Sequence, residues 1–242
     1  MSSPESTVDE VPYVEHLGDS RQYWRDIILG VNDGLVSMFL LVAGVVGGGL
    51  DTKSVLLTGI AGAIAGAVSM GVGEYIATKS QEEVFEREIA LEREHLEHHR
   101  DREIAELKDL FRDTGLKGDI VNEVVDAYDK DDEALMNIMM ALEFGVLDHT
   151  RRSPYVAMAA SAALFLAGSM TSVLPFAFSV TPNTGLFWAA VGSSIALFLV
   201  GALKTWATKG NWLRSGGENF LLATAGAVLS YYVGDLYQRT FG

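Results

Sequence analysis

The sequence of 242 residues contains no cysteine. This absence excludes disulfide bonds and thiolate metal sites, so a metal ion could bind only through carboxylate, imidazole, thioether, hydroxyl or backbone groups. Ligands of these kinds favour hard or borderline ions such as Mn(II), Fe(II) or Zn(II) over the ions of Cys-rich copper and zinc sites.

Basic residues are also scarce. Against 32 Asp and Glu there are 18 Lys and Arg, which gives a formal net charge of −14. Most of the negative charge lies in residues 81–150. This balance argues against nucleic-acid binding, which requires basic patches, and it is compatible with the collection of cations.

Several common sequence signals are missing. Residues 1–20 are polar and acidic, without a basic start or an early apolar run, so they predict a flexible tail rather than a cleaved signal peptide. No Walker-type phosphate loop occurs, and no nucleophile–His–Asp set stands out. ATP-driven transport by this chain alone has no support, and we expect no enzymatic activity.

Long apolar runs, in contrast, are present. A membrane-spanning helix needs roughly 20 predominantly apolar residues. Three runs meet this length, and two shorter ones depend on their flanking residues. The five runs are residues 27–50, 55–77, 155–180, 186–203 and about 220–237. Pro175, near the end of the third, predicts a kink or a stop there.

The segment between the second and third runs also predicts helices, and no strand pattern competes with them. The predicted helices are residues 81–99, 101–113, 119–128 and 132–147, with Gly115 just past the second. We therefore predict an all-α fold, an integral membrane bundle of five transmembrane helices with a small cytosolic helical domain inserted between spans two and three. The predicted boundaries are a tail at 1–20, spans one and two at 21–80, a metal-binding domain at 81–150 and spans three to five at 151–242.

The positions of Lys and Arg predict the orientation, because these residues concentrate on the cytosolic side of membrane proteins. With the amino terminus in the cytosol, only Lys53 and Arg239 lie near span ends on the far side, and all other such residues lie inside. The loops at 51–54 and 181–185 are very short, so spans one and two, and spans three and four, should be antiparallel neighbours.

Each of the first two spans carries a carboxylate. Asp33 is the only charged residue in 27–50, and Glu74 is the only one in 55–77. An Asp at the centre of a spanning helix costs about 2.5–3.5 kcal/mol, so such groups indicate an ion or proton path. Met70, one turn from Glu74, adds a thioether, and this pair suits Fe(II) better than Mg(II) or Ca(II). Alternatively, Asp33 snorkels to the helix end, or Glu74 only marks the mouth of the path.

The acidic segment places carboxylates on apolar helix faces. Glu92 falls in the apolar stripe of helix 81–99, and His95 lies three residues later on the same side. Because buried carboxylates need a partner, a shared divalent metal would satisfy several of them at once. The candidate metal ligands are Glu92, His95, Glu103, Glu106, Met139, Met140 and Glu143.

Solvation and core packing could also account for these side chains. The segment is so acidic that some glutamates meet any spacing by chance, and Glu88 with its exposed neighbours predicts a solvated face. His95 is equally consistent with an exposed side chain, and Met139 and Met140 with core filling.

Two motifs carry a resemblance to a known family. They are Arg25-Asp26-Ile27-Ile28 leading into Asp33-Gly34-Leu35-Val36, and Ser69-Met70-Gly71-Val72-Gly73-Glu74-Tyr75 before Lys79-Ser80-Gln81. From Arg21 onward the sequence resembles the vacuolar iron transporter family. The resemblance implies a five-span homodimer in the lipid bilayer that exchanges Fe(II), or Mn(II), for protons, with Asp33 and Met70 lining the path.

For the acidic domain, the resemblance implies a metal site built from glutamates and methionines. These match Glu92, Glu103, Glu106, Met139, Met140 and Glu143. Two positions depart from the family: Gln22 stands where plant members carry Glu, and His95 replaces another domain glutamate. An imidazole ligand would lose affinity below about pH 6.5 as the ring protonates.

The sequence thus predicts a proton-coupled antiporter that moves Fe(II) or Mn(II) out of the cytosol, across the cell membrane or into a vacuole. The domain could also hold Zn(II) or other divalent ions. One alternative is a membrane-tethered, ferritin-like di-iron carboxylate protein for iron oxidation or storage, because Glu-x-x-His motifs also occur in such bundles. A second is a scaffold whose acidic domain binds a basic partner.

Overall fold

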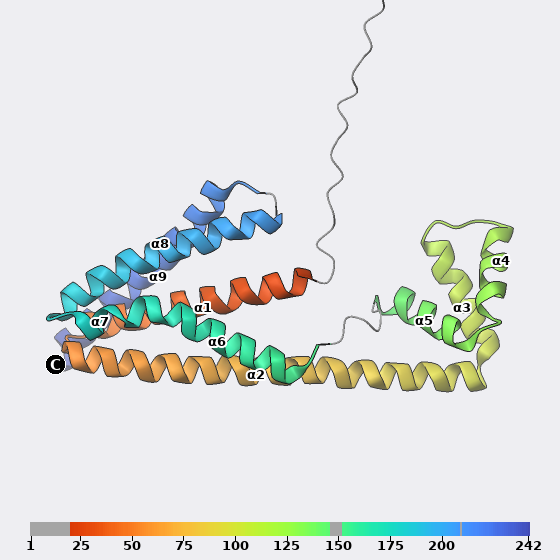
Figure 1. Cartoon of the computed structure of the whole chain (residues 1–242), viewed down its shortest axis with the longest axis horizontal. Coiled ribbons are helices and arrows are strands. Elements are labelled where there is room, and N and C mark those ends of the chain that lie inside the picture. Colours follow the sequence, from red (N-terminus) through yellow and green to blue (C-terminus); the bar gives the residue numbers. More distant parts are fainter. Residues whose placement is uncertain (1–19, 146–151, 209) are drawn as a thin grey trace, which may run out of the picture.

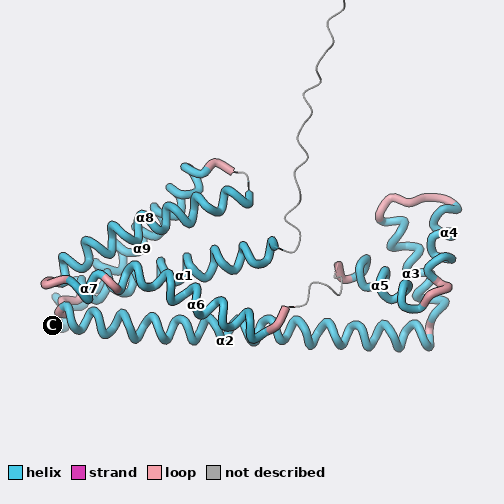
Figure 2. Tube along the Cα trace, in the orientation of Figure 1, coloured by secondary structure: helices cyan, strands magenta, loops and turns pink. Residues whose placement is uncertain are grey.

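The computed structural model describes residues 20–145, 152–208 and 210–242, and over these residues it contains helices but no strands (Figure 2). The all-α prediction is confirmed. The predicted flexible tail lies outside the described residues, apart from Ser20, which begins the first helix.

Five helices are long and apolar enough to cross a membrane, as the sequence predicts. They are α1 (Ser20–Gly47), α2 (Thr52–His98), α6 (Pro154–Val173, with its span continuing to Phe178), α8 (Pro182–Thr208) and α9 (Trp212–Phe241). The last two extend well beyond the predicted apolar runs. For α9, the Asn211 side chain caps the amino terminus by accepting hydrogen bonds from the backbone N–H groups of Leu213 and Arg214, so helix forms before the apolar run starts.

The third span is interrupted at Pro175, in agreement with the prediction. Helix α6 ends at Val173, where Leu174 still donates its N–H to the Met170 carbonyl at 2.9 Å, and a short helix α7 (Pro175–Phe178) follows. Proline has no N–H to continue the hydrogen-bond ladder, so the helix restarts in a new direction at this residue.

Helix α2 is a single rod of 47 residues. At 1.5 Å per residue it is about 70 Å long, more than twice the roughly 30 Å hydrocarbon core. It runs the whole length of the molecule, with the membrane helices beside one half and the small domain at its other end (Figure 1). The predicted helix at 81–99 is therefore the second half of α2, and no break separates it from the second span.

The small domain consists of the end of α2 with α3 (Arg100–Asp113), α4 (Asp119–Tyr128) and α5 (Asp132–Glu143). These bounds match the predicted helices to within one residue except at the end of α5, which stops at Glu143; residues 146 and 147 of the predicted helix lie outside the described residues. Gly115, at φ +101°, ends α3 in the left-handed conformation that glycine tolerates. The helices share one apolar core, which comprises Leu96, Leu107, Phe111, Val121, Val125, Leu135 and Met139.

Within the membrane bundle, α1 is the central helix and contacts α2, α6, α8 and α9. A Cβ atom on Gly34 would overlap the Phe165 backbone of α6, and one on Gly168 would overlap the Val31 backbone of α1, so these glycines allow the two helices to touch. Among the described residues, α9 contacts neither α2 nor α6. The order around α1 is therefore α2, α6, α8, α9, with a gap between α2 and α9.

Candidate metal centre

A sharp turn at the end of α2 creates the best candidate metal site. Helix α2 ends at His98 and α3 begins at Arg100, so the last turns of α2 and the first turn of α3 meet. Glu92 and His95 from α2 and Glu103 from α3 each offer one ligand atom, and these atoms all lie within 4.8 Å of one another. His95 Nδ1 lies 3.2 Å from Glu103 Oε1.

The two carboxylates of this triad are buried. Glu92 and Glu103 are each only 4% exposed, whereas His95 is half-buried. The Oε1 atom of Glu92 accepts no hydrogen bond from any group in the described part of the chain. Burying a charge without a partner is costly, and two such carboxylates also repel each other, so the site is suited to a cation that would offset both penalties.

Further carboxylates surround the triad. Burial raises the pKa of Glu92 to about 7, and the negative charges of Glu103 and Glu143 add to the rise while His95 opposes it. Loss of hydration raises the pKa of Glu143 on α5 as well, with contributions from Glu106, Glu103 and Glu88. Carboxylates shift one another in this way only at short range. Glu106 and Glu143 therefore add negative charge near the triad, although both side chains are exposed.

The predicted methionine ligands are buried in the same domain. Met139 is 0% exposed and belongs to the apolar core, and Met140 is 5% exposed. Core filling accounts for the burial of Met139, and coordination by either sulfur stays a prediction.

Glu88 is the residue that the sequence prediction missed. We expected it on a solvated face, but it is half-buried and close enough to influence Glu143. The signal was its spacing: Glu88, Glu92 and His95 fall at i, i+4 and i+7, which is one face of a helix.

In the membrane part, Asp33 lies exposed on α1 and accepts a hydrogen bond from Ser37 Oγ at 3.0 Å. Farther along the same face, Leu41 packs against Gly62 of α2 and Leu40 against Gly226 of α9. Asp33 therefore points toward the gap between α2 and α9.

Met70 lies at the same depth as Asp33. The two helices are antiparallel, and Leu41 contacts Gly62. Asp33 is eight residues from Leu41 and Met70 is eight residues from Gly62, about 12 Å along each helix in the same direction. Met70 is half-buried and packs against the apolar cluster around Met38 and Phe165, and Glu74, also half-buried, follows one turn toward the small domain.

The turn of α1 that carries Asp33 is held from two sides. Asn219 of α9 donates its Nδ2–H groups to Asn32 Oδ1 at 2.8 Å and to the Leu197 carbonyl of α8 at 2.9 Å. On the other flank, Gly34 meets α6. Because the residues before and after Asp33 are held by α9 and α6, and Asn219 of α9 is itself bonded to α8, the carboxylate has a defined position.

A buried ion pair, which the sequence did not predict, joins the starts of α1 and α6. Arg152 Nη1 lies 2.6 Å from Asp26 Oδ2, and Asp26 is 7% exposed. The pair lies at the end of the bundle that faces the small domain, where it anchors the first span to the third (Figure 1).

Comparison with known proteins agrees with this architecture. The family model described as the VIT family matches residues 24–235, nearly the whole described chain. The chain belongs to the VIT family. Both the triad and the Asp33–Met70 level lie within the matched region.

Plant members of the family show the similarity over most of their length. Vacuolar iron transporter 1 of Tulipa gesneriana is 29% identical over 88% of this chain and 87% of its own. Vacuolar iron transporter 2 of Oryza sativa subsp. japonica is 33% identical over 74% of this chain and 73% of its own. Vacuolar iron transporter 1 of Arabidopsis thaliana is 30% identical over 89% and 86%.

Replacing the buried carboxylate of Glu92 should weaken metal binding. We expect Glu92→Gln to reduce the affinity of the detergent-solubilised protein for Mn(II) by about 100-fold or more, because even losing a hydrogen-bond partner of a ligand costs 10- to 100-fold. Isothermal titration calorimetry measures this change. Glu94→Gln, at an exposed position of the same helix, is the matched control and should bind normally. Equal affinities of the two variants would remove Glu92 from the site.

The raised pKa of Glu92 also predicts a pH dependence. Between the ordinary pKa near 4.5 and the folded-state pKa of about 7, the folded protein binds more protons than the unfolded chain. The stability of the metal-free protein should therefore fall as pH rises through this range and level off above it. Thermal unfolding in chelator at a series of pH values measures the trend, and Glu92→Gln should flatten it. A stability that instead rises steadily from pH 4.5 to 7 in the wild type, with no difference in Glu92→Gln, would contradict the assignment.

Proposed function

We propose that this multi-pass membrane protein is a divalent-metal transporter that exchanges Fe(II), or Mn(II), for protons. The observation that carries the proposal is the buried Glu92 carboxylate beside His95 and Glu103, at one end of the helix whose other half spans the membrane. Glu92 Oε1 has no hydrogen-bond partner among the described residues. The plant relatives are named vacuolar iron transporters, which supports iron as the cargo.

The geometry of α2 suggests a route for the ion. Glu92 and Glu74 are eighteen residues apart on one unbroken helix, about 27 Å. Glu88 lies between them on the side of the triad. In this mechanism the small domain captures the ion with Glu92, His95 and Glu103 and their neighbours Glu106, Glu143, Met139 and Met140. Glu74 then admits it to the level of Asp33 and Met70.

The exposed position of Asp33 supports a homodimer. A carboxylate at this depth cannot face lipid without a large penalty, yet in a single chain Asp33 points out through the gap between α2 and α9. A second copy covering this gap by two-fold symmetry would bring two Asp33 carboxylates to a shared, lipid-free path.

Proton coupling follows from the chemistry of Asp33. Once the ion is partly dehydrated and held by Asp33 and Met70, protonation of Asp33 from the far side removes the negative charge and releases the metal. We place the small domain in the cytosol because Lys and Arg concentrate at the span ends on its side: Arg152 precedes α6, Lys204 is near the end of α8 and Arg214 near the start of α9, whereas Lys53 and Arg239 lie at the opposite helix ends. Transport then runs out of the cytosol, across the cell membrane or into a vacuole.

The ferritin-like alternative fits the domain less well. Di-iron carboxylate bundles use Glu-x-x-His motifs from two helices, and Glu92–His95 is the only such motif in the sequence. The alternative also gives Asp33 no role. It predicts oxygen consumption by the Fe(II)-loaded protein, whereas the transport mechanism predicts none.

The transport proposal is tested by metal flux into proteoliposomes under an imposed pH gradient. We expect wild-type protein to take up Mn(II) or Fe(II) in proportion to the gradient, and Asp33→Asn to lose at least about 90% of this flux, because a neutral amide neither attracts the ion nor accepts the proton. Glu218→Gln, an exposed carboxylate at the start of α9, is the control and should transport normally. Metal flux that does not depend on the pH gradient would refute antiport. Full flux in Asp33→Asn would refute the assignment of Asp33 to the ion path.

A further inference from the structure

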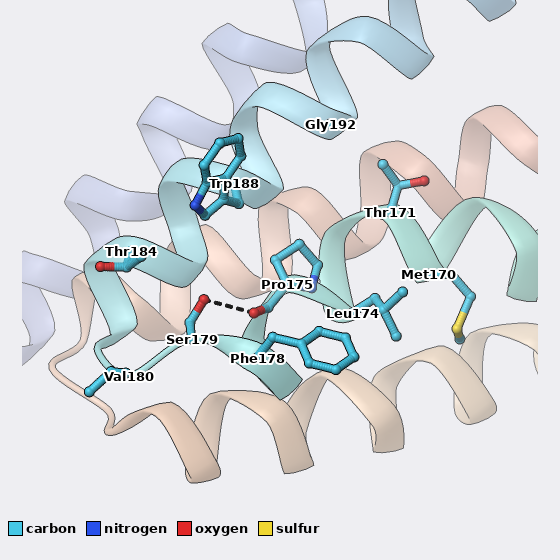
Figure 3. Close-up of a pocket in the computed structure, with 10 residues that line it drawn as sticks. All are labelled: Met170, Thr171, Leu174, Pro175, Phe178, Ser179, Val180, Thr184, Trp188 and Gly192. Carbon is cyan, nitrogen blue, oxygen red and sulfur yellow. Dashed lines mark hydrogen bonds between the residues drawn. The ribbon is translucent and has the colours of Figure 1, made fainter.

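A groove lies between α6, α7 and α8 at the end of the bundle far from the small domain (Figure 3). Its volume is about 620 Å³, within the range of small-molecule sites, and it is open along one side. The break at Pro175 creates it, because α7 turns away from the line of α6. Leu174, Phe178 and Val180 line one wall, and Trp188 and Gly192 of α8 line the other.

The groove lacks the charged side chain that a metal ion or a strongly polar ligand would need. None of the described residues that line it is charged. Ser179 donates its hydroxyl to the Pro175 carbonyl at 2.7 Å (dashed in Figure 3), and the hydroxyls of Thr184 and Thr181 hydrogen-bond to each other at 2.9 Å. An occupant must therefore be bound mainly by apolar contact, which the hydrophobic effect favours.

The position of the groove indicates that it faces lipid rather than a second copy of the chain. The order of helices around α1 puts the α6–α8 seam on the opposite side of α1 from the α2–α9 gap. A second copy that covers Asp33 leaves this seam free. On the same helix α8, the apolar side chains of Phe187, Ile195 and Leu199 are also exposed, as expected for a surface that faces lipid.

The depth of the groove matches one leaflet. On α8 it extends as far as Gly192, ten residues from the helix start at Pro182, which is about 15 Å along the axis or half of the roughly 30 Å hydrocarbon core. Trp188, 57% exposed, stands in the outer part of the groove, where aromatic side chains favour the region near the lipid headgroups.

From these observations we infer that the groove is a lipid site that holds one acyl chain of a phospholipid from the leaflet far from the small domain. The chain lies between α7 and α8 and packs against Trp188. Gly192 keeps the inner end of the groove open, because a Cβ there would lie only 3.2 Å from Thr171 Cγ2.

Fluorescence quenching by brominated lipid tests this site. The probe is a full-length variant that keeps only Trp188, with Trp24, Trp206 and Trp212 changed to Phe, in vesicles of phosphatidylcholine with a varied fraction brominated on the acyl chains. Bromine quenches a tryptophan that it touches. We expect strong quenching whose dependence on the brominated fraction corresponds to about one lipid. Filling the groove by Gly192→Leu should reduce the quenching at least twofold.

The matched control carries its tryptophan at Leu199, an exposed position farther along α8, with Trp188 changed to Phe. Quenching of this tryptophan should correspond to several exchanging lipids, and Gly192→Leu should not change it. The inference is overturned if Trp188 behaves like this control, which means bulk lipid only, or if Trp188 is not quenched, which means that protein covers the groove. The comparison of the two reporters decides the question even if Gly192→Leu fails to fold, and neither outcome depends on metal flux.

Discussion

A carboxylate removed from water needs a positive partner, and this constraint governs the molecule. Glu92 and Glu103 are 4% exposed and lie beside each other and His95, with no ion pair to Lys or Arg among the described residues, and Glu92 Oε1 has no hydrogen-bond donor there. Asp26, by comparison, is buried to a similar degree and is paired with Arg152. The chain therefore pairs this buried carboxylate with arginine, and the contrast with the triad is the basis of the proposed cation site.

The unbroken helix α2 links the triad to the membrane part, which supports the proposed transport route. One uninterrupted helix carries Met70 and Glu74 in the membrane and Glu92 and His95 in the small domain, so the two sites keep a fixed separation and share one axis. The central helix α1 is fixed just as firmly around Asp33 by the Asn32–Asn219 hydrogen bond and the Gly34 contact. In the proposed mechanism, motion that opens or closes the path therefore comes from other helices or from a second copy.

Much of the fold and of the candidate metal site was predictable, because the spacing of apolar residues along the sequence indicates which positions are buried. Hydropathy located the spans, and the 3.6-residue period exposed Glu92 as a polar residue in an apolar stripe. The hydropathy pattern separated the second span from the helix at 81–99, although residues 78–82 lack Gly and Pro and so contain no stop signal, which agrees with the unbroken helix α2. Nor could it find the Asn32–Asn219 and Asp26–Arg152 pairs, because their partners are distant in sequence and their meeting depends on tertiary packing.

The most direct test of the central claim is a structure of the protein prepared with Mn(II) or Fe(II), with anomalous scattering used to locate the metal. We predict one peak among Glu92, His95 and Glu103 at ligand distances of about 2.0–2.5 Å and a second beside Asp33 in the gap between α2 and α9. Absence of metal from both positions at saturating concentration, with the carboxylates paired to Lys or Arg instead, would contradict the account.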